Sequence, residues 1–324
     1  MTTSAEDSES DERIVIDENT EEVDLVRQRL TDLGDLSFLK SAKVLNLRWN
    51  RLTKIQGLNI PTLTELILYD NQIKKIENLD LLVNLKYLDL SYNRIEKMEN
   101  LDGLEKLEKL YVCRNKISKI EGLENLKNLK VLEFGDNRIE RIENLESLIN
   151  LEELHLGANQ IKIIENLECL SSTLKLLDLP ANAITKIKGL ETLKNLETLS
   201  IAQNGVSKIE NLDLLQNLRV LDLNDNIIKE LEGLKNLKKL NRLWIRKIKN
   251  LTPAKLVAEL SMLSSLEHLV IEGTELSKEK DYRQQIFEVL PNLQQLDSYP
   301  IWWKSGDPWQ LAPDGFFGDR KKET

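Results

Sequence analysis

The sequence has few of the residues that stabilise secreted domains or cross membranes. Its 324 residues include two cysteines, Cys113 and Cys169. Disulfide frameworks need more, so a reducing compartment is expected, here the nucleus and cytoplasm. No apolar run approaches about 18 residues and no apolar stretch lies near the start, so we expect neither a membrane span nor a signal peptide.

Histidine is equally scarce, and the short motifs of common catalytic sites are absent. The two histidines, His155 and His268, lie far apart in the sequence, which argues against the usual kind of metal cluster. The sequence contains no G-x-x-x-x-G-K, G-x-S-x-G or C-x-x-C motif. We therefore expect no enzymatic activity, no cofactor and no metal site.

A positively charged face is also lacking. The formal net charge is -9, and residues 1–24 hold ten acids against Arg13 alone, so the remainder is neutral. This balance argues against binding to nucleic acid or to an anionic membrane. Residues 1–24 are predicted to form an acidic disordered tail. Such tails usually keep a protein soluble; the alternative is phosphorylation of Ser4 and Ser8, each of which has an acid three residues on.

What the sequence does contain is a repeat. Asparagine recurs about every 22 residues within one frame, of which residues 85–95 (Leu-Lys-Tyr-Leu-Asp-Leu-Ser-Tyr-Asn-Arg-Ile) are a clear copy. This frame, L-x-x-L-x-L-x-x-N-x-I/L, is the leucine-rich repeat. The nine asparagines are Asn50, Asn71, Asn93, Asn115, Asn137, Asn159, Asn182, Asn204 and Asn226.

The repeat predicts an α/β solenoid, a leucine-rich-repeat horseshoe with a parallel β-sheet on its concave side. Leu88 and Leu90 lie two positions apart, so they point to the same side of an extended segment, towards the core. Each repeat shares its core with its neighbours. A buried asparagine amide needs partners, and we expect bonds to the backbone of its own and adjacent turns. A 22-residue repeat leaves room on the convex side for 3-10 turns and loops.

The terminal repeats are expected to depart from the frame because they cover the ends of the core. The predicted repeat domain is 25–297, with about eleven repeats. It begins with a half-repeat in which Gln28 takes the asparagine position, and it ends with a cap from about residue 275. Within that cap we expect a short helix from Tyr282 and a final strand-like turn to Asp297. Residues 298–324 form an aromatic-rich extension, which is predicted to pack on the cap; the alternative is a set of anchors for a partner.

The central strand positions form a column on the concave sheet: Asn46, Ile67, Asp89, Tyr111, Glu133, His155, Asp178, Ser200, Asp222, Trp244 and Val270. From Asp89 to Trp244 this column has four acids, three rings and no Lys or Arg. Acids are poor strand formers, so folding does not require this pattern; the alternative is an ordinary solvated face. The pattern predicts a protein-binding strip made of Asp89, Tyr111, Glu133, His155, Asp178, Asp222 and Trp244.

The tail of the repeat, as in residues 71–79 (Asn-Gln-Ile-Lys-Lys-Ile-Glu-Asn-Leu), resembles the repeat of the leucine-rich regulatory subunit of protein phosphatase-1. The resemblance covers roughly residues 25–297. It implies that the column docks the phosphatase catalytic subunit, with an inhibitor polypeptide as a third partner and a role in mitosis. Three positions depart from the family pattern: His155 stands in place of Phe, Arg242 in place of an acid, and Val270 in place of Tyr. The alternative is a scaffold for a cytoskeletal or splicing assembly, since proteins of those classes use similar repeats.

Overall fold

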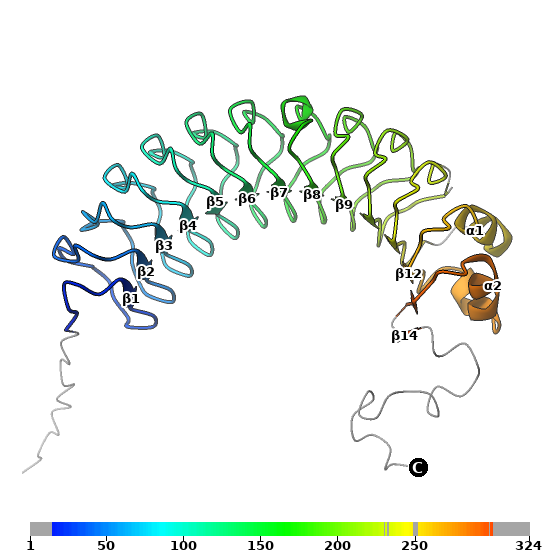
Figure 1. Ribbon diagram of the computed structural model, residues 1–324, viewed down its shortest axis with the longest axis horizontal. Coiled ribbons are helices and arrows are strands. Elements are labelled where there is room, and N and C mark those ends of the chain that lie inside the picture. Colours follow the sequence, from blue (N-terminus) through cyan, green and yellow to red (C-terminus); the bar gives the residue numbers. More distant parts are fainter. Residues whose placement is uncertain (1–14, 230, 232, 249–251, 298, 301–324) are drawn as a thin grey trace, which may run out of the picture.

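The computed structural model describes residues 15–229, 231, 233–248, 252–297 and 299–300. These residues form a horseshoe whose inner edge is one sheet with strands in sequence order (Figure 1). The first thirteen strands are parallel, β14 is antiparallel to β13, and the predicted horseshoe is confirmed. The strands are β1 Glu22–Asp24, β2 Val44–Asn46, β3 Glu65–Ile67, β4 Tyr87–Asp89, β5 Lys109–Tyr111, β6 Val131–Glu133, β7 Glu153–His155, β8 Leu176–Asp178, β9 Thr198–Ser200, β10 Val220–Asp222, β11 Arg242–Trp244, β12 His268–Val270, β13 Gln295–Leu296 and β14 Tyr299–Pro300.

The alternation of side chains in each short strand separates the core from the concave surface. Leu88, in the middle of β4, is fully buried, and so is Leu90 just after the strand. Leu88 is paired in register with Leu110 of β5, and the same pairing of leucines continues along the stack. A continuous apolar core therefore runs the length of the horseshoe, as the repeat frame predicts.

The repeated asparagines bind the backbone of neighbouring repeats, as predicted. The Nδ2 of Asn137 donates to the carbonyl of Phe134 in its own repeat at 2.9 Å and to that of Val112 in the preceding repeat at 3.0 Å. Its Oδ1 accepts the backbone N–H of Ile117 at 3.0 Å. One side chain thus fixes the turns after two successive strands, and equivalent bonds recur from Asn50 to Asn226.

A second position, on the far side of each repeat, adopts a left-handed backbone conformation. Asparagine fills it at five places, for example Asn166, whose Nδ2 donates to the carbonyl of Ile142 at 2.7 Å and whose φ is 59°. Glycine fills it elsewhere, for example Gly189 with a φ of 76°. Both residues tolerate a positive φ, which explains why the repeat reads Asn or Gly before its leucine.

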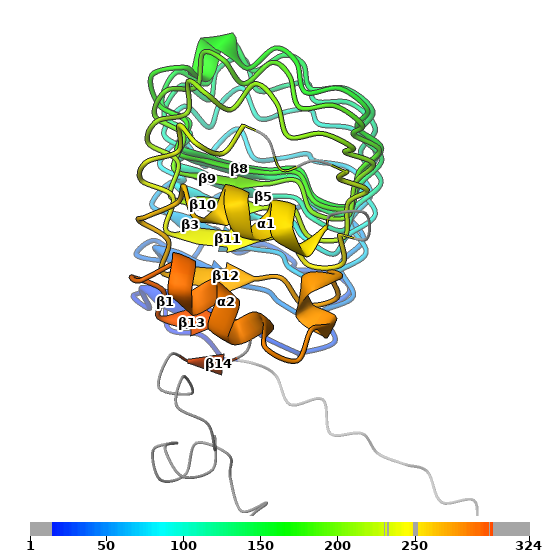
Figure 2. The same ribbon diagram turned by 90° about the vertical axis from the view of Figure 1, so that its right-hand side faces the viewer.

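Regular helices gather at the C-terminal end of the described chain (Figure 2). They are the 3-10 helix η2 (Leu276–Lys278) and the eight-residue helices α1 (Pro253–Leu260) and α2 (Tyr282–Val289); one further 3-10 helix, η1 (Glu168–Leu170), lies on the convex side. The short helix expected from Tyr282 is present, whereas α1 falls in a stretch for which no helix was predicted. Within the described residues, no helix has the length and apolar character needed to cross a membrane.

The ends of the repeat domain differ slightly from prediction. Strand β1 begins at Glu22, three residues inside the predicted acidic tail, because Val23 is buried and pairs with Leu45 of β2. At the other end, Asp297 takes the place of the repeated asparagine: its Oδ1 accepts the backbone N–H of Ile271 at 2.8 Å. Most of the predicted tail, with Ser4 and Ser8, and the extension from residue 301 onwards lie outside the described residues.

Candidate protein-binding surface

The seven predicted binding residues lie in one column of the concave sheet. Register pairs Asp89 with Tyr111, Tyr111 with Glu133, Glu133 with His155, and His155 with Asp178 on the consecutive strands β4 to β8. Beyond Ser200 on β9, Asp222 of β10 pairs with Trp244 of β11. We call this set of seven residues the central column. Its placement follows from a regular repeat without bulges, so the third residue of each of these strands faces the same surface.

Three carboxylates surround His155 at the middle of the central column. Its Nδ1 lies 3.8 Å from an oxygen of Glu133 and 3.8 Å from one of Asp178, on the two flanking strands. Its Nε2 lies 3.5 Å from Glu153, the first residue of its own strand. The imidazole is about three-quarters buried, with 23% of its side chain exposed. Protonated His155 would therefore neutralise part of an otherwise acidic centre.

Opposing effects act on the acid–base equilibria of this cluster. Burial alone would lower the pKa of His155, but the nearby carboxylates of Asp178, Glu133 and Glu153 outweigh it and raise that pKa above its usual value. Burial raises the pKa of Glu133, and the charge of Asp178 adds to the rise, although a 2.6 Å bond from the backbone N–H of Gly135 opposes it. The cluster thus favours a positive charge at its centre.

The raised pKa of His155 predicts a pH-dependent contribution to stability. A group whose pKa is raised on folding stabilises the protein below its unfolded pKa, near 6.5, and this contribution is lost as the pH rises through the folded pKa. We expect His155→Asn to lower the free energy of unfolding by less than about 1 kcal/mol at pH 5.5, with a smaller difference at pH 8.5. Urea unfolding of both proteins at the two pH values measures this, and a difference that grows with pH would contradict the assignment.

Asp89 and Tyr111 form the N-terminal end of the central column, and Tyr87 lies beside them. Asp89 is buried, which raises its pKa, while the backbone N–H of Ser91 donates to it at 2.9 Å and Arg48 lies 3.8 Å away. The rings of Tyr87 and Tyr111 lie 5.2 Å apart, and burial, as the main cause, raises the pKa of Tyr87 to about 12. Both phenols therefore remain neutral donors at physiological pH.

The C-terminal end of the central column borders a hollow that the sequence did not indicate. This hollow, of about 270 Å³, is lined by Arg242, Trp244, His268, Leu269, Val270, Gln295 and Asp297. Trp244 forms part of its wall, and the Nδ1 of His268 lies 3.2 Å from the amide oxygen of Gln295 on the next strand. The two positions noted as departures, Arg242 and Val270, thus line the same space as Trp244. A partner side chain could be held here against the indole ring.

Asp222, at the same end of the central column, lies close enough to the charged rim residues Asp225 and Arg246 for their charges to act on it. Burial raises its pKa, and it accepts the backbone N–H of Asn224 at 3.0 Å. On the rim, Asp225 pairs with Lys247 at 2.8 Å and with Arg246 at 3.5 Å. Arg246 and Lys247, the cations beside this end of the central column, are therefore already paired.

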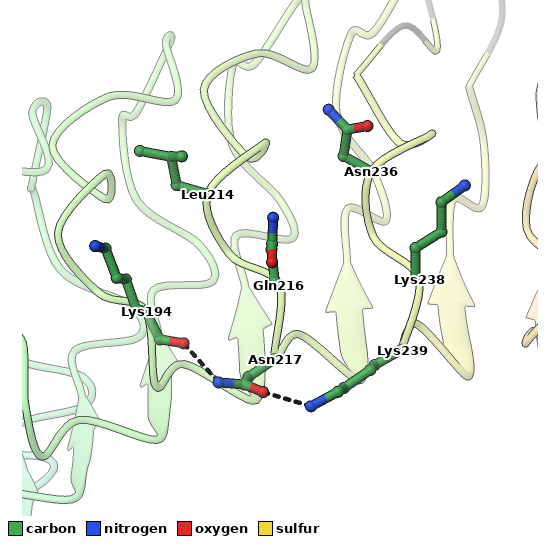
Figure 3. A pocket seen from close by; sticks show the side chains of 7 residues that line it. All are labelled: Lys194, Leu214, Gln216, Asn217, Asn236, Lys238 and Lys239. Carbon is green, nitrogen blue, oxygen red and sulfur yellow. Dashed lines mark hydrogen bonds between the residues drawn. The ribbon is translucent and has the colours of Figure 1, made fainter.

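A larger hollow lies away from the central column, on the flank that leads into the strands (Figure 3). It measures about 580 Å³, and loops of successive repeats with three lysines line it. Asn217 connects two of those lysines by donating to the carbonyl of Lys194 at 2.9 Å and accepting from Lys239 at 2.7 Å. These bonds join neighbouring repeats, which is a structural role. In the part of the chain that the structure describes, no group of three His, Cys, Asp or Glu side chains is arranged to hold a metal ion.

Sequence reasoning overlooked the aromatic residues near the repeated asparagines of the first repeats. Trp49, Tyr69 and Tyr92 form a chain of ring contacts on the rim of the sheet. They lie one or two positions before an asparagine, so comparing those positions between repeats would have revealed them. The central strand positions lie earlier in each repeat and do not include these rings.

Comparisons with known proteins agree with this architecture. The sequence profile of the family described as Leucine Rich repeats (2 copies) matches residues 83–125 and 127–169. No curated protein matches the chain. The chain is a leucine-rich-repeat protein, a class typically made of non-enzymatic binding scaffolds, and its concave sheet is suited to protein–protein interaction.

Several solved structures have a similar fold. An internalin (inlF) from Listeria monocytogenes is 24% identical, with a TM-score of 0.67 over 87% of this chain and 88% of the internalin chain. A leucine-rich-repeat protein of Leptospira interrogans is 26% identical, with a TM-score of 0.70 over 80% of this chain and 67% of the other. Internalin C2 of Listeria monocytogenes is 30% identical, with a TM-score of 0.53 over 58% of this chain and 83% of the internalin chain. What these structures share with this chain is the leucine-rich-repeat fold.

Proposed function

We propose that this protein is a regulatory subunit that binds the catalytic subunit of protein phosphatase-1 through its central column. The observation that carries the proposal is the order of side chains on consecutive strands, which is acid, ring, acid and ring from Asp89 to His155. The same order, followed by an Asp and a Trp, is what the resemblance to the phosphatase regulator implies. Asp222 and Trp244 supply those last two groups.

The chemistry of the central column supports a partner with basic groups. Burial has already removed much of the water around Asp89, Glu133 and Asp222, so each gains more from an arriving cation than a fully hydrated acid would. Trp244 offers a large apolar surface beside the hollow. The sequence has no [R/K]-V/I-x-F/W segment of the kind by which most phosphatase-1 regulators dock, which is consistent with binding through a folded surface.

On this proposal, regulation follows from the shape and charge of the horseshoe. The concave face would hold the enzyme and change its activity, maturation or localisation in the nucleus and cytoplasm. An inhibitor polypeptide would join as a third component. The protein itself would contribute no catalytic group.

Removing one ring and one acid of the central column tests the proposal. We expect Trp244→Ala to weaken binding of the phosphatase catalytic subunit by about 2 kcal/mol, roughly 30-fold, and Glu133→Ala to weaken it by less, because a partly solvated acid contributes less than a buried anchor. The double variant should no longer capture the enzyme in a pull-down. Calorimetric titration of each variant with purified catalytic subunit gives the affinities.

The matched control is Ser200→Ala, which changes the same column on β9 at a position outside the predicted contact. It should bind as the unchanged protein does, and all variants should keep its melting temperature. Undiminished binding by the folded double variant would refute the central-column proposal. Failure of the unchanged protein to bind the enzyme would leave the scaffold of another assembly as the better hypothesis.

A further inference from the structure

A continuous series of ring and guanidinium contacts follows the rim of the sheet beside β1 to β5. The guanidinium of Arg27 lies 4.3 Å from the centre of the Trp49 ring, which meets Tyr69 edge-on at 6.2 Å. Tyr69 lies 4.7 Å from Tyr92, which is covered by the guanidinium of Arg114 at 4.9 Å. The guanidinium of Arg48 lies 5.5 Å from the centre of the Tyr69 ring. We call the set the ring strip; its members are Arg27, Arg48, Trp49, Tyr69, Tyr92 and Arg114.

Four residues of the ring strip occupy a backbone position that does not favour large side chains. The residue before each repeated asparagine has a positive φ, with 56° at both Trp49 and Tyr92. Later repeats place Ala158 and Ala181 in this position at 52° and 53°, and they keep the same strand pairing. Bulky side chains at positive φ are unusual and carry a cost in strain. Since alanine suffices for the fold, the rings and cations of the first repeats point to a function.

The arginines of the ring strip differ in how far their hydrogen-bonding edges are available to an acidic ligand, and Arg48 already lies 3.8 Å from Asp89. A guanidinium that stacks on a ring uses its face, while its N–H groups remain in the plane and suit a carboxylate. Arg114 directs one such group to Asp136 at 2.9 Å, but among the described residues no carboxylate lies within 4.0 Å of the Arg27 guanidinium. Trp49 has 42% of its surface exposed, so part of its ring can also receive an apolar contact.

Further cations line the same rim two residues beyond this backbone position. Arg29, Arg51 and Arg94 are exposed, and none has an ion-pair partner within the described residues. The rim of the first repeats therefore carries an excess of positive charge, although the repeat domain as a whole is neutral. Asp70 interrupts it in the middle of the ring strip and is exposed. A polypeptide can space its acids to avoid Asp70, whereas the regular phosphates of a nucleic acid cannot.

We propose that the ring strip binds an extended acidic segment of a partner protein. Four strand spacings of about 4.8 Å separate β1 from β5, so the strip spans about 19 Å, the length of roughly six extended residues. Carboxylates of the segment pair with the arginine edges, and its apolar side chains rest on Trp49. The ring strip meets the central column at one point, where Arg48 lies 3.8 Å from Asp89, and the proposal does not depend on the phosphatase.

Fluorescence anisotropy with the 324-residue chain tests the proposal. The probe is a labelled peptide of about twelve residues in which Glu alternates with Tyr and Pro, and the reference peptide has Gln in place of Glu. We expect the Glu peptide alone to bind, and more weakly as salt is added. Trp49→Ala and the double variant Arg27→Ala/Arg114→Ala should each weaken binding about tenfold or more.

The matched control is Lys247→Ala, which removes an exposed cation from the same backbone position near the other end of the sheet, where φ is 61°. It should bind the Glu peptide as the unchanged protein does, and circular dichroism should show that all variants keep the fold. Equal binding of the Gln peptide, no binding of the Glu peptide, or no loss in the ring-strip variants would overturn the proposal. Tighter binding of a single-stranded oligonucleotide would assign the strip to nucleic acid instead.

The acids of the chain's own first residues are the remaining competitor. A variant with Glu6→Gln, Asp7→Asn and Glu9→Gln should bind the Glu peptide no more tightly than the unchanged protein. Binding that appears only in this variant would mean that the protein's own acids occupy the strip, and the inference of a partner segment would then be wrong.

Discussion

Replacing Asn137 by alanine is expected to lower the free energy of unfolding by roughly 2–4 kcal/mol. Its amide contacts four backbone groups: its two N–H donors reach three carbonyl oxygens, so one N–H is shared, and its oxygen accepts one N–H. The buried N–H of Ile117 would lose this acceptor, and the carbonyls of Val112 and Phe134 would each lose one donor. Because these groups belong to successive repeats, the loss also weakens the interface on which a solenoid depends.

The matched control is Asn150→Ala, which removes an asparagine that also joins two repeats. Its amide is exposed and donates once, to the carbonyl of Lys127 at 2.8 Å, a group that water can satisfy. The expected loss is at most about 1 kcal/mol. Urea unfolding followed by circular dichroism measures both variants. Equal effects would show that burial of the repeated asparagine does not determine its contribution.

The features that the sequence predicted are those that repeat. The spacing of Leu88 and Leu90 is read directly from the chain, and a fixed repeat length transfers it to every other repeat. The same regularity made the central column predictable, since constant spacing sets the register of all strands. The bonds of Asn137 followed from the need to satisfy a buried amide.

The features that the sequence did not predict depend on side-chain directions or on breaks in the repeat. The pairing of His155 with Glu153 involves two residues of one strand. The contact of His155 with Asp178 depends on the rotamers of both side chains. Helix α1 lies where the frame is lost, so periodicity gave no signal there. The predicted acidic tail extended into β1 because acids flank Val23, the residue of β1 that joins the core.

The central column shows how a stable scaffold tolerates groups that oppose folding. Burial raises the pKa of Asp89, Glu133 and Asp222, which means that the fold disfavours their charged forms. A carboxyl with a raised pKa destabilises the folded protein once the pH exceeds its unfolded value. The long leucine core supplies stability enough to hold such groups in place. A basic partner would relieve the unfavourable charge, and this relief would contribute to binding.

Substitution of Gly189 by alanine is expected to lower the free energy of unfolding by roughly 2–4 kcal/mol. With a φ of 76°, the residue is in the left-handed region, and a Cβ there would lie 2.4 Å from the carbonyl oxygen of Ile164 in the preceding repeat. A backbone atom cannot move aside as a flexible side chain can, so the two repeats would have to separate. Gly205→Ala is the control: no positive φ restricts it, and its nearest contact is the side chain of Thr185 at 3.3 Å. Its expected cost is at most about 1 kcal/mol.

Asparagine at the same position should be less harmful than alanine, although its side chain is larger. Asn166 and Asn211, in the repeats on either side, adopt φ values of 59° and 60° and donate to the preceding repeat at 2.7 and 2.6 Å. Gly189→Asn could form the equivalent bond to the carbonyl of Ile164, which offsets part of the strain. The unchanged protein should therefore have the highest unfolding midpoint in urea, Gly189→Asn a lower one, and Gly189→Ala the lowest. If alanine proved as stable as asparagine, the side-chain bond would contribute nothing, and the choice of Asn or Gly in the repeat would follow from backbone conformation alone.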